Sequence, residues 1–473
     1  MKKKEFFRKN YPRFVYQSYF YKLNKNNLEI FFDFKIEPDI NFKPKVVIKK
    51  INKSRFQKIN KNILDNLIFH LGLIELLSYW KATCSPEIEI RAGFLNKDQI
   101  CWWKNLILKG MGQFFYENKI NFLAPNFLKI NVTRNDLVIF QSNLKNRILV
   151  PIGGGKDSIV TLEILKAAKK EINCFVLNPT SITKKIMKIA GCKEPIFVKR
   201  KIDPKLFKLN QKGFLNGHTP FSAYLSFLSV LVAFLFDYKY IAFSNERSSN
   251  EGNLKYLGRV INHQYSKSFD FEKKFRYYSK KYLLKNIEYF SFLRPLYEIQ
   301  IAKLFSKYPQ YFLVFLSCNE AFKTASGTKK PIKKWCCNCP KCLFVFAILY
   351  PFLKESQLIK IFNQNLFQKK NLLPIMQALI GEKKFKPFEC VGTKKESQVA
   401  FYLSWKKCRG LTSANLPYLL KYFERKILPK YPSLEKQSKR ILKSWSNQHN
   451  LPKKFIPFLF NYQNQNETER IKK

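Results

Sequence analysis

Acidic residues are scarce in this sequence, and their scarcity gives the chain a strong positive charge. The 473 residues include 33 Asp and Glu against 86 Lys and Arg, for a formal net charge of +53. A charge of this size would attract nucleic acid, an anionic membrane or phosphorylated metabolites. No block of five or six basic residues forms a tail, and Lys, Asn, Ile and Phe are frequent throughout, as an AT-rich genome would produce. The net charge alone therefore does not identify a partner.

Long apolar runs are also few. The first 27 residues begin with a basic stretch but contain no continuous apolar segment, which argues against a signal peptide. Residues 219–236 carry no charge, and their 18 positions reach the lower limit for a membrane span. Three serines, a proline and two strand-like neighbours instead favour a helix buried against a sheet. We expect no membrane span and a cytoplasmic location.

Internal repeats and long low-complexity linkers are absent, and the 46% hydrophobic content excludes wholesale disorder. The length suggests two or three domains. Composition and patterning divide the chain into an N-terminal α+β region at 1–143, a second region at 144–350 that ends in a cysteine cluster, and a mostly helical region at 351–473.

The second region alternates short apolar runs with amphipathic ones. Residues 147–152, 172–178, 195–200 and 239–244 are typical of buried strands, and residues 158–170, 180–191 and 219–236 of helices. This alternation predicts βαβ units in a doubly wound parallel sheet. Such sheets bind ligands beyond the carboxyl ends of their strands, where residues 153–158, Asn178 and residues 244–253 fall.

A glycine-rich loop, GGGKDS, joins the first of these strands to its helix. Three glycines let backbone N–H groups approach a phosphate, while Lys156, Ser158 and the helix N-terminus add further donors. The loop has neither the Walker A pattern nor the dinucleotide-binding pattern. It resembles the SGGxDS loop of the PP-loop ATP pyrophosphatases, which split ATP to AMP and pyrophosphate while adenylating a substrate oxygen. The resemblance implies an adenine nucleotide alpha hydrolase-like fold and an ATP site at Gly153, Gly154, Gly155, Lys156, Asp157, Ser158 and Asn178, with Gly153 replacing the usual serine.

The sequence shows no secretion signal, so its eleven cysteines are not expected to form disulfides. Cys336, Cys339 and Cys342 form C-x-x-C-x-x-C, and Cys318 is a plausible fourth ligand for tetrahedral zinc. The arrangement resembles the zinc site of the 7-cyano-7-deazaguanine synthases, which implies a structural zinc. An iron–sulfur cluster and reduced structural cysteines stay open, and Cys337 is an alternative ligand.

Polar residues concentrate in two segments, at 244–253 and 258–272, and the stretch at 290–300 adds Arg294 and Glu298. Arginine can clamp a phosphate or carboxylate, and glutamate can hold Mg²⁺ or act as a base. The candidates are Asn245, Glu246, Arg247, Glu251, Arg259, His263, Gln264, Tyr265, Ser266, Arg294 and Glu298. Among the remaining histidines, His218 is either a helix cap or a ligand contact, His70 is expected in the core, and His449 carries no signal.

The ordered set VPIGGGKDS, GHTPFSA, SNERSSNEGN, GRVINHQYSKSFDFE, FSFLRPLYEIQIA and WCCNCPKC resembles the UDP-N-acetylmuramoyl-L-alanyl-L-glutamate epimerases of bacterial peptidoglycan synthesis. The resemblance covers about residues 145–350 and implies an isomerase that uses ATP and Mg²⁺ to invert the terminal L-Glu of a UDP-muramoyl dipeptide. Adenylation would remove the carboxylate charge, so that a protein base could take the Cα proton. The residues considered for the acid and base roles are His263, Glu246, Glu251, Tyr265 and Lys267, and those for substrate binding are Asn245, Arg247, Arg259, Gln264, Ser266, Arg294 and Glu298.

Two other functions stay open. The positive charge also suits a PP-loop enzyme that modifies RNA or a nucleobase, or a nucleic-acid-binding protein with a degenerate loop. An RNA enzyme would show steeply salt-dependent RNA binding and would need RNA to release pyrophosphate.

Overall fold

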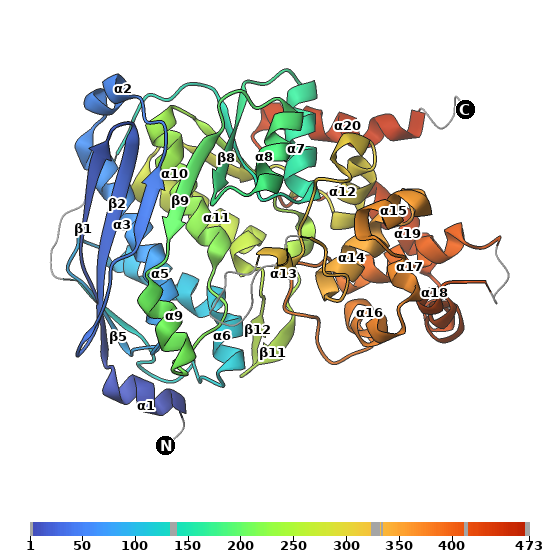
Figure 1. The fold of residues 1–473 in the computed structure, drawn as a ribbon, viewed down its shortest axis with the longest axis horizontal. Helices are drawn as coiled ribbons and strands as arrows, with labels where there is room; N and C mark the ends of the chain where they lie inside the picture. Colours follow the sequence, from blue (N-terminus) through green and yellow to red (C-terminus); the bar gives the residue numbers. More distant parts are fainter. Residues whose placement is uncertain (1–2, 133–139, 323–331, 333, 411–414, 469–473) are drawn as a thin grey trace.

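The computed structural model describes residues 3–132, 140–322, 332, 334–410 and 415–468. In these residues a large sheet with its covering helices lies beside a helical group formed by the C-terminal part of the chain (Figure 1). The fold is therefore mixed α/β with a helical C-terminal region, as the sequence predicts.

Eleven strands of the described chain form the large sheet, in the order β13-β10-β7-β8-β9-β4-β2-β1-β5-β6, with β3 paired to β2. They are β1 (Arg13–Asn24), β2 (Asn27–Ile36), β3 (Ile40–Phe42), β4 (Lys45–Ile48), β5 (Glu87–Ile90), β6 (Lys129–Val132), β7 (Ile148–Pro151), β8 (Ile172–Leu177), β9 (Ile196–Lys201), β10 (Tyr240–Phe243) and β13 (Glu288–Ser291). A separate antiparallel hairpin joins β11 (Leu254–Tyr256) to β12 (Arg259–Ile261).

Strands β13, β10, β7, β8 and β9 run parallel to one another, which confirms the predicted βαβ pattern. The connecting helices are α7 (Lys156–Ala167), α8 (Ser181–Ala190) and α10 (Phe221–Phe236). Helix α8 ends at Gly191, whose φ of 75° lies in the left-handed region that a glycine adopts without strain.

The N-terminal strands extend the same sheet. Strand β4 pairs antiparallel with β9, so that Val47 lies opposite Lys199. Strands β1 and β2 form an antiparallel hairpin, and β2 alternates buried and half-buried residues, as expected of a strand packed more tightly on one face. The sheet is thus continuous from the N-terminal region into the part that carries the glycine-rich loop.

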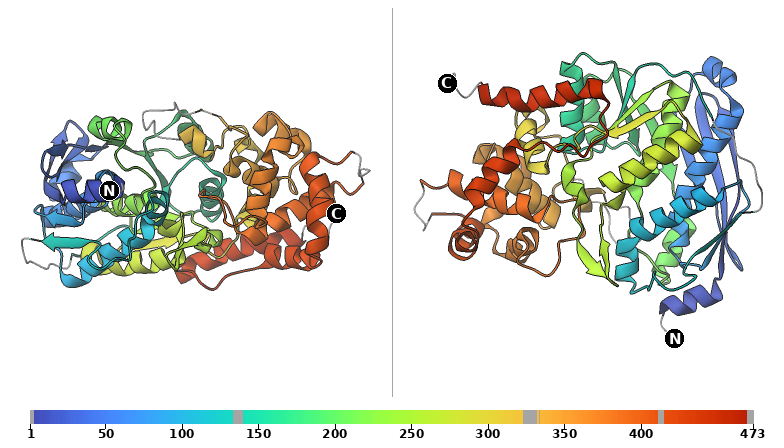
Figure 2. Two further views of the ribbon diagram at one scale, coloured as in Figure 1. Left: turned by 90° about the horizontal axis from the view of Figure 1, so that it is seen from below. Right: turned by 180° about the vertical axis from the view of Figure 1, so that it is seen from behind.

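The remaining helices lie on the sheet or in the C-terminal group, which Figure 2 shows from two further sides. Those before residue 310 are α1 (Lys3–Asn10), α2 (Lys53–Lys58), α3 (Lys61–Glu75), α4 (Leu77–Trp80), α5 (Lys97–Gly110), α6 (Gly112–Glu117), α9 (Pro204–Gln211), α11 (Phe269–Tyr278) and α12 (Glu298–Phe305). Those after it are α13 (Asn319–Phe322), α14 (Pro340–Leu349), α15 (Glu355–Phe362), α16 (Leu373–Ile380), α17 (Lys394–Lys407), α18 (Tyr418–Tyr422), α19 (Leu434–Lys443) and α20 (Ile456–Thr468).

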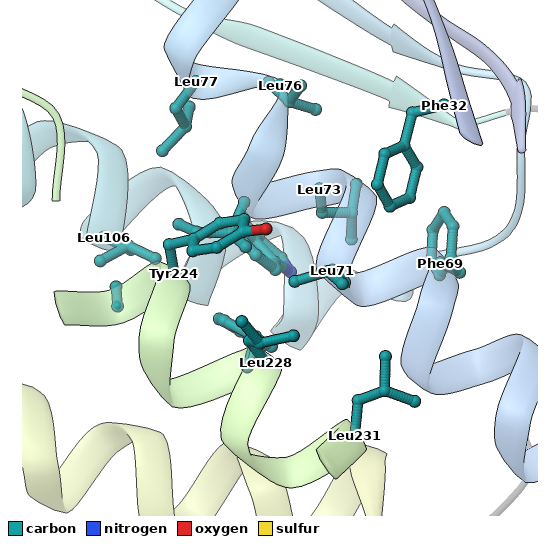
Figure 3. Packing of buried hydrophobic residues seen from close by; sticks show 14 of the residues in the cluster. Phe32, Phe69, Leu71, Leu73, Leu76, Leu77, Leu106, Tyr224, Leu228 and Leu231 are labelled. Atoms are coloured by element: carbon teal, nitrogen blue, oxygen red, sulfur yellow. The ribbon is translucent and has the colours of Figure 1, made fainter. Parts of the chain in front are cut away.

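The uncharged segment at 219–236 forms α10, an internal helix. Its residues Tyr224, Leu228 and Leu231 lie in the same buried cluster as Leu71 and Leu73 of α3 (Figure 3). In the described chain one helical stretch, Lys61–Trp80, has the length and apolar composition of a membrane span, but 83% of its apolar window is buried inside the protein. Both apolar helices therefore serve the core.

His70 lies in this core, as expected. Its Nε2 forms a hydrogen bond with the Tyr278 hydroxyl (2.9 Å), and burial lowers the pKa of His70 to about 4.

One cysteine pair contradicts the expectation of no disulfides. Cys174 in β8 is bonded to Cys192, which follows the end of α8. The two residues are 18 positions apart, but the strand–helix unit folds back and brings them together.

Candidate functional site

The glycine-rich loop lies at the carboxyl end of β7, as predicted. Gly154 has a φ of +93°, in the left-handed region, and space is open around the position that a side chain would take at Gly153. Gly155 precedes α7 and provides no side-chain cap for its first turn. The loop therefore leaves the start of α7 open to an anion.

Lys156 is buried beneath this loop, in contact with two carboxylates. Its Nζ donates to Asp157 Oδ1 (2.5 Å) and to Glu298 Oε2 at the start of α12. The other oxygen of Glu298 lies 3.5 Å from Lys341 Nζ. Burial would raise the pKa of Glu298, but Lys156 and Lys341 outweigh it and hold this pKa at about 2. Two ammonium groups therefore share one buried carboxylate.

Glu246 and Lys267 lie next to this cluster. Burial, reinforced by the charge of Glu298, raises the pKa of Glu246 to about 7, so this carboxyl changes protonation near neutral pH. The Lys267 ammonium donates to Cys390 Sγ (3.3 Å). Burial opposes that charge, but Cys390, Glu246 and Asp157 raise the pKa of Lys267 above its ordinary value. Lys267 is therefore a fixed cation within reach of both the loop and Glu246.

Two histidines also lie within the influence of the Lys267 charge. The ring centres of His218 and His263 are 4.4 Å apart, and His263 Nδ1 lies 2.5 Å from Gln113 Oε1. Burial, then the charges of Lys267 and Lys386, lower the pKa of His263 to about 3. Burial, followed by His263, Lys81 and Lys267, also lowers the pKa of His218. Both rings are therefore neutral at physiological pH.

Arg294 departs from the expectation of substrate binding. It is fully buried, and its guanidinium donates to Glu272, Ser249, Ser291 and the main-chain carbonyls of Glu246 and Lys267. These partners occupy all five of its N–H groups, so none is left for a ligand. Arg294 instead supports the segments that carry Glu246 and Lys267.

The Tyr265 hydroxyl contacts residues of α5 and α11 instead of the loop. It donates to Asp270 Oδ2 (3.1 Å) and lies 3.4 Å from Asn105 Oδ1. Of the five acid and base candidates, Lys267 therefore lies near enough to Glu246 and to His263 for its charge to lower the pKa of both, whereas the Tyr265 hydroxyl is bonded to Asp270.

The other candidates surround this centre at different depths. Asn178 is exposed, and its Oδ1 accepts from the Arg200 N–H (2.8 Å), while Arg259 is exposed on the β11–β12 hairpin. Contacts to neighbouring segments are made by Asn245 (to Ser291), Arg247 (over the Tyr297 ring), Glu251 (to the Lys394 N–H and Lys386) and Gln264 (to Val391), and Ser266 is buried.

Several residues of this centre were missed. Lys341 and Cys390 come from the helical C-terminal part, and Gln113 comes from α6 in the N-terminal region. Lys341 had a signal, because it stands between the predicted metal ligands Cys339 and Cys342. Gln113 had none, since it is 150 residues from His263 in the chain.

The cysteine cluster has the predicted members. The sulfur atoms of Cys318, Cys336, Cys339 and Cys342 all lie within 4.8 Å of one another. Neighbouring sulfurs are 3.5 to 3.9 Å apart, close to the separation of about 3.8 Å that four thiolates at about 2.3 Å from zinc would have. Cys337 points instead to the Phe362 carbonyl (3.2 Å) and lies outside the group.

Comparison with known proteins gives matches over most of the chain. Residues 5–292 match the model of the MurL N-terminal domain, and residues 314–418 match that of the MurL C-terminal domain. A UDP-N-acetyl-alpha-D-muramoyl-L-alanyl-L-glutamate epimerase of Xanthomonas oryzae pv. oryzae is 32% identical over 395 residues, covering 83% of this chain and 85% of that protein. One of the same name from a Micromonospora species is 34% identical over 340 residues, or 72% of this chain and 75% of that protein. The resemblance noted in the sequence is confirmed: this chain belongs to the MurL family.

Proposed function

We propose that this protein is an ATP- and Mg²⁺-dependent epimerase that inverts the terminal L-Glu of UDP-N-acetylmuramoyl-L-alanyl-L-glutamate to D-Glu for peptidoglycan synthesis. The names of its relatives support the substrate and the inversion. The observation that carries the proposal is the joint placement of an open glycine-rich loop, Lys156 and the titrating carboxyl of Glu246. A cytoplasmic location is part of the same proposal.

The loop suits the phosphates of ATP. The uncapped start of α7 and the Lys156 ammonium would provide donors for an anion, and the open space at Gly153 would admit it, as in the PP-loop fold that we propose for this sheet. Asp157 is the carboxylate of this loop that stays partly exposed, with 26% of its side-chain surface accessible, and it could hold Mg²⁺. ATP would supply the AMP group for an acyl-adenylate, with release of pyrophosphate.

The need for ATP follows from the acidity of the substrate. Removing the Cα proton beside a free carboxylate would place a second negative charge on that group. An acyl-adenylate carries no charge at this carbonyl, so the enolate is far easier to form. Two buried groups can then move the proton: Glu246, whose pKa is about 7, and His263, whose ring is uncharged at physiological pH. Hydrolysis of the adenylate would release the inverted dipeptide and AMP.

Chiral analysis of the product tests this proposal. With ATP, Mg²⁺ and the UDP-muramoyl L-Ala-L-Glu substrate in D₂O, we expect D-Glu carrying one deuterium at Cα, together with AMP and pyrophosphate. Omitting ATP should stop both the exchange and the inversion. Neither D-Glu nor deuterium in the complete mixture would refute the epimerase, and pyrophosphate release that requires RNA would favour the RNA-modifying alternative.

A structural zinc in the cysteine cluster is the second part of the proposal. Four thiolates leave no open coordination position, so the metal would hold Cys318 against the start of α14 and take no part in the reaction. We expect about one equivalent of zinc in the purified protein and loss of most of it in a Cys339→Ser variant. Cys337→Ser is the matched control and should keep the metal, because its sulfur lies outside the group. Iron in place of zinc, or equal metal content in both variants, would contradict this assignment.

A further inference from the structure

The hydrogen bond between His263 and Gln113 fixes the state of the His263 ring. Gln113 Nε2 donates to Glu117 Oε1 (2.7 Å), which leaves the Gln113 Oε1 as the atom that faces His263 Nδ1 (2.5 Å). An amide oxygen only accepts hydrogen bonds, so Nδ1 of His263 carries the proton. The lone pair of the neutral ring is therefore on Nε2.

No described residue forms a hydrogen bond with His263 Nε2. His218 packs against the ring, with the ring planes inclined by 47°, and its own Nε2 is buried without a partner. The charges that lower the pKa of the two rings are the ammonium groups of Lys267, Lys386 and Lys81, while the Glu117 carboxylate lies behind Gln113. These cations hold the unliganded His263 ring neutral, and the negative charge of a bound substrate would offset them, so that Nε2 could then take a proton.

The two histidines are held by residues of the N-terminal region (1–143) as well as by their own segments. Gln113 belongs to α6, and Lys81, which follows α4, donates to the Gly217 carbonyl next to His218 (3.1 Å). Lys267 lies between the histidines and the loop in electrostatic terms. Its charge interacts with His218 and His263 and also with Glu246 and with Asp157 of the loop. The two histidines would therefore lie near a substrate that is activated at the loop.

We propose that His263 Nε2 takes the glutamate Cα proton on one face of the activated substrate, and that Gln113 is the positioning residue that fixes its tautomer. This assignment rests on the proposed epimerase function. The C–H electron pair becomes the Cα=C bond of the enolate, the carbonyl electron pair moves onto oxygen, and the proton stays on Nε2. The opposite face of Cα then receives a proton that derives from solvent. His263 returns its own proton to solvent before the next turnover.

A His263→Gln variant separates proton removal from ATP use. In D₂O, we expect Cα deuterium incorporation and D-Glu formation to fall by about 100-fold or more, as for loss of a general base. Pyrophosphate formation in the first turnover should stay close to the wild-type amount, because the loop is intact, and this readout also shows that the variant is folded. His449→Gln is the matched control, since His449 lies near Trp445 in the C-terminal part, and it should behave as wild type.

A second pair of variants tests the tautomer without changing the histidine. Gln113→Leu removes the acceptor for Nδ1–H and should lower deuterium incorporation, whereas Gln113→Glu keeps an acceptor there and should restore it. Full exchange and D-Glu formation in His263→Gln, or equal rates in the two Gln113 variants, would overturn the assignment. If instead the wild-type protein makes no D-Glu, the proposed function itself fails.

Discussion

An Asp157→Asn variant is expected to form AMP and pyrophosphate about 10²–10³ times more slowly than the wild type, with no change in its thermal unfolding temperature. The loss follows from removing the only partly exposed carboxylate of the loop, where a metal–phosphate group would bind. The fold should survive because Lys156 keeps Glu298 as its ionic partner, so no buried ammonium is left unpaired.

Pyrophosphate release at saturating substrate and a thermal melt of the same sample check this result. Asp270→Asn is a suitable control, because Asp270 also lies in the first turn of a helix and pairs with two lysines, Lys109 and Lys274 (2.9 Å each). Its contacts are with Tyr265, Lys109 and Lys274 and not with the loop, so this variant should retain the wild-type rate. If Asp157→Asn releases pyrophosphate at the wild-type rate, the loop takes no part in the reaction.

An Arg294→Met variant is expected to lower the free energy of unfolding by about 3–5 kcal/mol. The change deletes five internal donors and leaves the carboxylate of Glu272 buried without its cation. Glu272 would keep only the hydrogen bond from the Asn450 side chain (3.0 Å). Urea unfolding followed by tryptophan fluorescence measures the loss.

The source of this loss can be separated with a second substitution. Glu272→Gln in the Arg294→Met background removes the unpaired charge and should recover part of the stability. If Arg294→Met has the same free energy of unfolding as the wild type, Arg294 does not stabilise the site. If its stability is unchanged but the KM for the dipeptide changes, Arg294 binds substrate.

Local features of the fold were predictable because they depend on neighbours in the chain. The strand, glycine loop and helix at 148–167 are encoded by a short apolar run, three glycines and helical spacing. The end of α8 at Gly191 and the members of the cysteine group follow from residue types that have few other uses. The interior position of α10 followed from its length and composition.

Contacts between distant segments were not predictable in this way. Arg294 and Glu298 are four residues apart in one polar segment, and both are buried, but their different partners come from separate elements. Residue type alone could not show that Arg294 supports neighbouring segments whereas Glu298 pairs with Lys156 of the glycine-rich loop. The pairing of Gln113 with His263 likewise depends on how α6 lies against the loop after β12, which no local pattern encodes.

Strand β4 uses both of its edges, one for β2 and one for β9. Without residues 1–143, β9 would become an open edge of the sheet, with unpaired N–H and C=O groups available to other chains. The N-terminal strands therefore protect the part of the sheet that carries the glycine-rich loop from pairing with other chains and aggregating. Because β9 needs a partner strand, residues 144–350 could be separated from residues 1–143, in evolution or in an engineered protein, only if another segment covered this edge.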